Sequence, residues 1–236
     1  MRLFSFFLVL LQMSCAVIPD ISMRDKDVST VELGMIGTVK TNEASTHFIT
    51  SALPEINEKV RITITERTFD KASSKKYNKV QKDKSQQIVW DDSIHSRSNY
   101  LDLSIADKVT WVKQINSEFN DGVAAYLRSA DEPVLIASVS ISFPADLHRE
   151  LISAQEIYLV NNERKKYLFE LYDDHKRMKS VQLSSYLLFD YNTKEFCWIE
   201  NDKHEIIIAD INDTGCKKPM SETYQKVEKK KSEFKF

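Results

Sequence analysis

The sequence predicts an α+β fold in which one long amphipathic helix packs on a mostly antiparallel, twisted β-sheet. Between Glu156 and Ile211, short runs of alternating apolar and polar residues are separated by turns rich in Asn and Asp. Between Ser104 and Arg128, apolar residues recur every three or four positions, as they do on one face of a helix. Strands on both sides of a single helix are typical of the α+β class.

The composition is that of an ordinary folded domain. Of the 236 residues, 42% are hydrophobic and 29% are charged, and the formal net charge is −2. A chain of this length fits one domain or two small ones. The near-neutral charge gives no general attraction to nucleic acid, which we do not expect as a partner. With four glycines in the whole chain, the usual glycine-rich phosphate-binding loops are disfavoured.

The N-terminus has the pattern of an export signal. Arg2 is followed by the apolar run Leu3–Leu11, and the small residues Ser14, Cys15 and Ala16 come shortly after it. The apolar run is shorter than the roughly 20 residues that a membrane-spanning helix needs. We therefore expect the protein to be exported rather than held by a transmembrane helix.

Two modes of processing fit this signal. The box Leu11-Gln12-Met13-Ser14-Cys15 resembles that of bacterial lipoproteins as a class, although Gln12 stands where Leu is usual. The resemblance implies cleavage before Cys15 and a lipid on its thiol, so that the protein is anchored to a membrane of the cell envelope. The alternative is an ordinary cleavage that leaves Val17 first and gives a soluble periplasmic or secreted protein.

The domain layout follows from these signals and from the composition. We expect a signal peptide over residues 1–14, a tether over 15–30 and a single α+β domain over 31–216, with a possible subdivision near residue 104. Residues 217–236 are polar and basic, and we interpret them as a mobile tail.

The first half of the domain is predicted to hold several strands and one lysine-rich segment. Strands are expected at Val31–Lys40, Thr46–Ala52, Lys59–Phe69, Ile88–Trp90 and Tyr100–Leu103. Between the third and fourth, residues 70–87 contain six lysines. We interpret this segment as a solvated loop or hairpin tip; the alternative is a patch for an anionic surface such as lipid headgroups, a polysaccharide or nucleic acid.

The predicted helix begins with Ser104 as its N-cap and Asp107 at the third helical position. Asn120-Asp121-Gly122 can kink it or split it in two. Its polar face carries both acidic and basic side chains, so we expect the helix to pack on a sheet rather than lie on a membrane. A long strand, Val134–Phe143, and a short helix over residues 144–155 follow.

The C-terminal part reads as a meander of consecutive antiparallel strands, because its loops are short. The expected strands are Glu156–Val160, Lys166–Tyr172, Ser180–Asp190, Glu195–Ile199 and His204–Ile211. Cys197 and Cys216 are the even pair that remains once Cys15 is lipidated or removed. In an exported chain this pair is expected to form a disulfide.

The chemistry-bearing residues give only weak indications of function. Asp91-Asp92-Ser93-Ile94-His95 and Asp173-Asp174-His175 place carboxylates beside imidazole, either as ordinary turns or as parts of a dispersed site. We assign no catalytic, cofactor-binding or metal-ligating residue and expect no cofactor. The favoured function is a non-catalytic envelope lipoprotein that binds another protein or a surface ligand. The alternatives are a carrier of a small apolar ligand inside the curved sheet, and a hydrolase or metal-dependent enzyme that uses His95 and His175.

Overall fold

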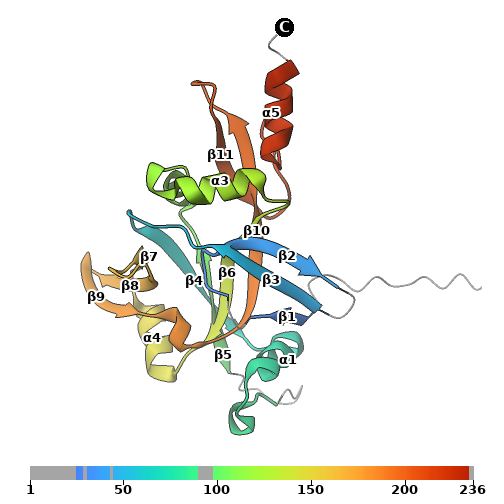
Figure 1. Cartoon of the computed structure of the whole chain (residues 1–236). Helices are drawn as coiled ribbons and strands as arrows, with labels where there is room; N and C mark the ends of the chain where they lie inside the picture. The colour runs from blue at the N-terminus through green and yellow to red at the C-terminus, as the bar shows by residue number, and fades with distance from the viewer. Residues whose placement is uncertain (1–24, 29–30, 43–44, 90–97, 234–236) are drawn as a thin grey trace, which may run out of the picture.

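The protein has an α+β fold with a mostly antiparallel sheet, as the sequence predicts (Figure 1). The computed structural model describes residues 25–28, 31–42, 45–89 and 98–233. The strands are β1 (Asp25–Asp27), β2 (Ile36–Thr41), β3 (Ser45–Ala52), β4 (Val60–Thr68), β5 (Asn99–Ile105), β6 (Val134–Ser142), β7 (Glu156–Asn161), β8 (Tyr167–Asp173), β9 (Lys176–Val181), β10 (Leu187–Glu200) and β11 (Ile206–Asn212). The α-helices are α1 (Lys71–Val80), α2 (Lys108–Ile115), α3 (Asp121–Ser129), α4 (Ala145–Ser153) and α5 (Tyr224–Glu233), and short 3-10 turns are η2 (Lys84–Gln86), η3 (Glu118–Asn120) and η4 (Leu183–Ser185).

Strand β6 is the centre of the sheet. Its β-branched and small residues are buried along most of its length, which suits a strand covered on both faces. One edge of β6 pairs with β10 over its whole length, and the other edge pairs first with β2 and then with β5. The sheet therefore divides at β6 into a β2-β3-β1 branch and a β5-β4-β7-β8-β9 branch.

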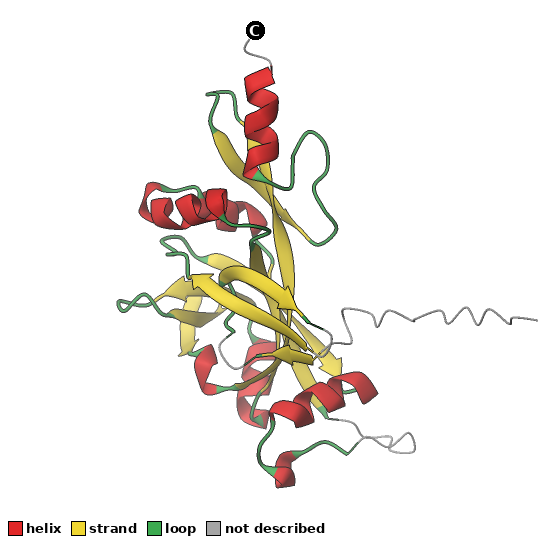
Figure 2. Cartoon of the chain, turned by 45° about the vertical axis from the view of Figure 1, so that its right-hand side comes forward, coloured by secondary structure: helices red, strands yellow, loops and turns green. Residues whose placement is uncertain are grey.

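The two branches are joined by a common core under α2. Trp111 of α2 and Tyr167 of β8 meet edge to face, with ring centroids 6.5 Å apart, and both rings lie against Gly34 just before β2. The Tyr167 hydroxyl donates to the carbonyl of Pro54 at 2.6 Å. Most helices gather at the two ends of the sheet, with α5 at one end and α1 at the other (Figure 2). The helices at the two ends therefore form two separate surfaces of the molecule.

The C-terminal meander is only partly as predicted. Strands β7, β8 and β9 follow one another as antiparallel neighbours, and β10 pairs with β11. The expected strand Ser180–Asp190 is wrong, because β9 ends at Val181 and β10 begins at Leu187 after a 3-10 turn. The break expected between Asp190, where one predicted strand ends, and Glu195, where the next begins, is also wrong. There β10 continues along β6, and the pairing register shifts between Asn192 and Thr193. The Asn192 side chain donates to the Ser138 hydroxyl at 3.2 Å.

The long helix is two shorter ones, and it starts later than predicted. Ser104 lies in β5 opposite Thr63 of β4 and Ser138 of β6, so it cannot act as an N-cap. Asp107 takes that role, because its carboxylate accepts from the backbone N–H of Thr110 at 2.9 Å. The helix then breaks after α2, and a 3-10 turn leads into α3 at the Asn-Asp-Gly stretch.

Two polar segments are more ordered than their composition indicates. The lysine-rich segment after β4 forms α1, with Asp70 as its N-cap in a capping box with Ser73. The segment read as a mobile tail contains α5, whose Val227 is 7% exposed and belongs to the main core. Of the strand expected at Ile88–Trp90, Ile88 and Val89 lie in no strand and Trp90 is outside the described residues.

Cys197 and Cys216 are joined by a disulfide, in agreement with the pairing expected from the cysteine count. Cys197 is fully buried in β10. The bridge encloses β11 and the start of the segment that leads to α5. Ser221 also pairs with Trp198 of β10 through two backbone hydrogen bonds of 2.8 and 2.9 Å. The C-terminal part of the chain is thus fastened to β10 at two neighbouring points.

Candidate functional site: a cleft beside the free edge of β11

Strand β11 is an edge strand, and side chains of α2 and of its C-cap residue cover part of its edge. Asn116 donates to the carbonyl of Ile208 at 2.7 Å and accepts from the N–H of the same residue at 3.1 Å. The Lys108 ammonium donates to the carbonyl of Ile211 at 2.8 Å. These contacts satisfy backbone groups that an uncovered edge would leave to solvent or to another chain.

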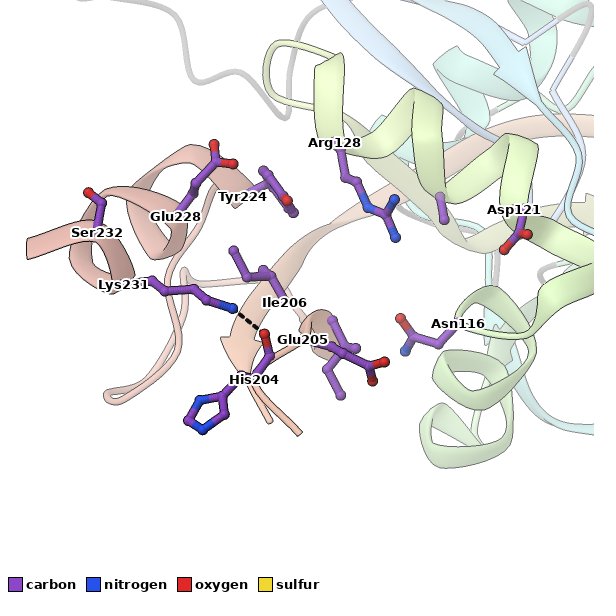
Figure 3. Close-up of a pocket in the computed structure, with 12 residues that line it drawn as sticks. Asn116, Asp121, Arg128, His204, Glu205, Ile206, Tyr224, Glu228, Lys231 and Ser232 are labelled. Atoms are coloured by element: carbon purple, nitrogen blue, oxygen red, sulfur yellow. Dashed lines mark hydrogen bonds between the residues drawn. The ribbon is translucent and has the colours of Figure 1, made fainter. Parts of the chain in front are cut away.

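The next part of this edge opens into a cleft of about 560 Å³ between α3, β11 and α5. Figure 3 shows Asp121 and Arg128 projecting from α3, Tyr224 and Lys231 from α5, and Ile206 between the two helices. These residues are far apart in the sequence and meet because the β10–β11 ribbon passes between the helices.

The antiparallel ladder gives the direction of the backbone groups of Ile206. Trp198 stands opposite Ile208, and Glu200 stands opposite Ile206, with no register shift between the two pairs. Trp198 bonds to Ser221 on the far side of β10, and Ile208 bonds to Asn116 on the far side of β11. Backbone groups alternate in direction along a strand, so the N–H and C=O of Ile206 also point outward, into the cleft.

Charged and aromatic side chains border this edge. The guanidinium carbon of Arg128 lies 5.9 Å from the ring centroid of Tyr224, within cation–π range. Gln225 donates to the backbone carbonyl of Arg128 at 2.8 Å and so ties α5 to α3. Arg128 is exposed and has no ion pair among the described residues. Its charge is therefore available to a ligand.

The opposite wall of the cleft is held by Lys231. Its ammonium donates to the carbonyl of His204 and lies 3.4 Å from the carboxylate of Glu200 (Figure 3). The His204 imidazole is 2.9 Å from the same carboxylate. The pKa of Glu200 is lowered, first by the hydrogen bond from His204 and then by Lys231. The turn between β10 and β11 is thus fixed to α5 by a small charged network.

Replacing Asn116 with alanine is expected to loosen β11. The change removes the partners of both backbone groups of Ile208, at a cost of about 1–3 kcal/mol in the free energy of unfolding. Amide hydrogen exchange at Ile208 should accelerate, and a urea titration gives the loss of stability. Asn116→Asp is the matched control, because it keeps the acceptor and loses the donor; its effect should be smaller at Ile208 N–H. Unchanged exchange in Asn116→Ala would show that this side chain does not protect the edge.

His95 and His175, the candidate site residues, are not seen to form a catalytic group in the part of the chain that the structure describes. His95, with Asp91 and Asp92, lies outside the described residues. Asp174 and His175 form the turn between β8 and β9, are exposed and have positive φ angles of 44° and 62°. Such angles are common for Asp and His in turns, so this cluster has the geometry of a tight turn.

The remaining histidines lie on separate elements. His47 of β3 is bonded to Ser45, His148 of α4 to Glu66, and His204 to Glu200. Within the described ranges, no group of three or more His, Cys, Asp or Glu side chains is arranged to hold a metal ion. The dispersed His/Asp site therefore stays a hypothesis that depends on His95.

The core around Gly34, where the carrier hypothesis would need a cavity, is closely packed. A methyl group added at Gly34 would lie 2.7 Å from the ring of Tyr167 and 2.9 Å from that of Trp111. Leu103, Ile136 and Trp111 are fully buried in the same core. The core at this position is filled by side chains, and the carrier hypothesis stays a prediction for the rest of the sheet.

A second charged cluster, on the β7–β9 side, is explained by internal contacts. The Lys59 ammonium donates to the Tyr172 hydroxyl and lies 4.0 Å from the centre of that ring. The Tyr172 hydroxyl in turn donates to Glu170 at 2.8 Å, and Arg177 binds the other oxygen of Glu170, also at 2.8 Å. Burial raises the pKa of Glu170, but the bonds from Arg177 and Tyr172 outweigh it and leave this pKa lowered. The cluster joins the residue just before β4 to β8 and β9.

Comparison with protein-family models, with curated proteins and with solved structures found no match for the chain. Among the residues that the structure describes, no helix has the length and apolar character needed to cross a membrane.

Proposed function

We propose that this protein is an exported, lipid-anchored binding protein of the cell envelope, and that the cleft beside β11 takes an extended segment of a partner protein. The signal sequence and the lipoprotein-like box ending at Cys15 support export and anchoring; both lie outside the described residues. The observation that carries the binding proposal is the outward-facing backbone of Ile206 at an open cleft.

An extended polypeptide fits this cleft better than a compact small molecule. A segment that lies along β11 can pair with the N–H and C=O of Ile206 and so add a strand to the sheet, which is a common mode of peptide recognition. Its direction is limited by α3 on one side and α5 on the other. Arg128 offers a positive charge to an acidic side chain, and Tyr224 offers an aromatic face. Backbone pairing supplies affinity, and these two side chains supply selectivity.

Photo-crosslinking in the native envelope tests the location of the partner. A crosslinking amino acid at Ala124, which lines the cleft, is expected to capture one major protein. The same group at the exposed neighbour Ala125, which is not part of the cleft lining, is the control and should capture little. Equal capture at both positions would contradict the proposal, and capture of a second copy of this chain would show that the cleft serves self-association.

Two substitutions test the mode of binding in the same experiment. Ile206→Pro removes an N–H that faces away from the ladder, a position where an edge strand tolerates proline, and should abolish capture while the protein stays folded. Arg128→Glu should lower capture at least tenfold by repelling the acidic side chain, because it replaces an attractive charge with a repulsive one. Capture that persists in both variants would show that the partner does not bind as a strand on β11.

A further inference from the structure

We propose that α1 and η2 form a basic surface that contacts anionic phospholipid headgroups and orients the domain on its membrane. This inference rests on the lipid anchor of the proposed function and is independent of the β11 cleft. The lysines of this segment supply the positive charge that attracts the headgroups. Because the segment lies near β1, the first described strand, its binding would orient the domain relative to the membrane anchor.

The positive charge of this surface is concentrated and exposed. Residues 71–86 contain six lysines and a single acidic residue, Asp83. Five of these lysines are exposed: Lys71, Lys75, Lys79, Lys82 and Lys84. The sixth, Lys76, is half-buried and pairs with Asp190 of β10 at 2.6 Å. Arginine is absent from the segment, and flexible ammonium groups of lysine suit a fluid headgroup layer as point charges.

The lysines are displayed on a firmly held helix. On its inner side, Tyr77 packs in an aromatic cluster with Phe69, Tyr100 and Phe189, whose ring centroids are 4.7–5.7 Å apart in neighbouring pairs. Asp70 caps the helix N-terminus, and the Lys76–Asp190 pair ties it to β10. The outer side is thus fixed with its charges directed away from the sheet. Val89, just after η2, is 81% exposed and adds an apolar side chain next to this basic surface.

The surface lies where the chain leaves toward the anchor. Lys26 of β1 is opposite Thr46 of β3, and Thr46 lines the same cleft as Lys76 of α1. Figure 1 shows β1 just above α1, in the half of the molecule opposite to α5. Nine residues, 16–24, separate Cys15 from β1. Even fully extended they reach at most about 35 Å, so an anchored domain stays close to the membrane.

Proximity and charge together favour lipid over other anionic surfaces. Each lysine near an anionic membrane raises binding roughly fivefold, and the effect fades within about 8 Å at physiological salt. The lysines attract the headgroups by themselves, and the anchor at Cys15 strengthens this attraction because it keeps α1 within reach of the membrane. Nucleic acid is less suited, because the lysines are not interleaved with exposed aromatic side chains on which bases stack.

Vesicle flotation of the unlipidated mature chain tests this surface directly. The protein is residues 15–236 with Cys15→Ser, and the vesicles are phosphatidylcholine alone or mixed with phosphatidylglycerol. We expect binding only to the mixed vesicles, with partitioning that falls as salt is raised from 0.05 M to about 0.5 M. The triple variant Lys71→Glu, Lys75→Glu, Lys79→Glu should lower partitioning by more than a hundredfold, because it removes three attractive charges and adds three repulsive ones.

Reversing the charge of three lysines far from β1 is the matched control. It distinguishes an effect of the α1 surface from an effect of the net charge of the protein. Lys203→Glu, Lys217→Glu, Lys229→Glu changes three exposed lysines at the α5 end and should leave partitioning within about twofold. Glutamine at positions 71, 75 and 79 is a milder variant in case the reversals unfold α1, and it should still lower partitioning at least tenfold. Equal effects of the two triple reversals, or equal binding of wild type to both vesicle types, would overturn the proposal.

Failure of the α1 surface to bind headgroups can be distinguished from absence of the lipid anchor at Cys15. Intact mass of the protein purified from its envelope shows whether it is residues 15–236 plus acyl chains or Val17–Phe236 without lipid. An unlipidated mass would remove the anchor but would leave a measured headgroup affinity in place. A lipidated mass with no headgroup affinity would leave the anchor and remove the role of α1.

Discussion

Replacing Gly34 with alanine is expected to lower the free energy of unfolding by roughly 3 kcal/mol. Gly34 has φ +90°, a conformation that costs an L-residue about 1–2 kcal/mol. Its new methyl group would lie 2.7 Å from Cε2 of Tyr167 and 2.9 Å from Cη2 of Trp111. These rings are 3% and 0% exposed, so they can move only by disturbing the core, and overpacking adds about 1–3 kcal/mol.

Urea denaturation at neutral pH measures this loss, and Gly122→Ala is its control. Gly122 lies in α3, and a methyl group there meets nothing within 4 Å. In a helix, alanine is favoured over glycine by about 0.5–1 kcal/mol, so the control should be slightly more stable than the wild type. Similar midpoints for Gly34→Ala and the wild type would show that the contact between the two branches of the sheet is not tight.

The role of Gly34 shows what the sequence could and could not predict. A glycine inside an apolar stretch indicates a bend or a bulge, and the chain does turn at Gly34 before β2 begins. The reason for glycine at this position is the pair of rings above it, which come from residues 77 and 133 positions further along the chain. Such a requirement is set by tertiary packing and leaves no local pattern.

The fold class and most strands follow local patterns and could be predicted. Periodicity identifies β4, β6, β7 and β8 closely, and the cysteine count gives the disulfide. The errors arise where pairing overrides local preference. Asn192 looks like a turn residue but stays in β10 because β6 provides a partner along its full length, and Ser104 looks like an N-cap but stays in β5 for the same reason.

The candidate site could not be predicted, because its parts have no common sequence signal. Arg128 is an ordinary residue near the end of a helix, and Tyr224 stands in a segment whose lysines make it look disordered. Ile206 contributes through its backbone, which no residue pattern reveals. The outward direction of its N–H follows only from the pairing of β10 with β11 and from the Asn116 contacts.

Removing the disulfide is the other change with a large expected effect. Cys197→Ala with Cys216→Ala should lower the free energy of unfolding by about 3 kcal/mol, since a bridge across a loop of this size constrains the unfolded chain to that extent. Thermal denaturation and urea titration measure the loss. Reduction of the wild type is the control, because it opens the same loop without changing a side chain and should account for most of the effect.

The same variant connects stability to the proposed binding site. Strand β11 lies inside the closed loop, and on its outer edge Asn116 and Lys108 hold the backbone of Ile208 and Ile211. With the bridge open, we expect hydrogen exchange in β11 to accelerate more than in β6, and crosslinking from Ala124 to fall in proportion. A uniform rise in exchange across both strands would mean that the disulfide stabilises the domain as a whole. A rise confined to β11 would mean that it holds the edge to which a partner binds.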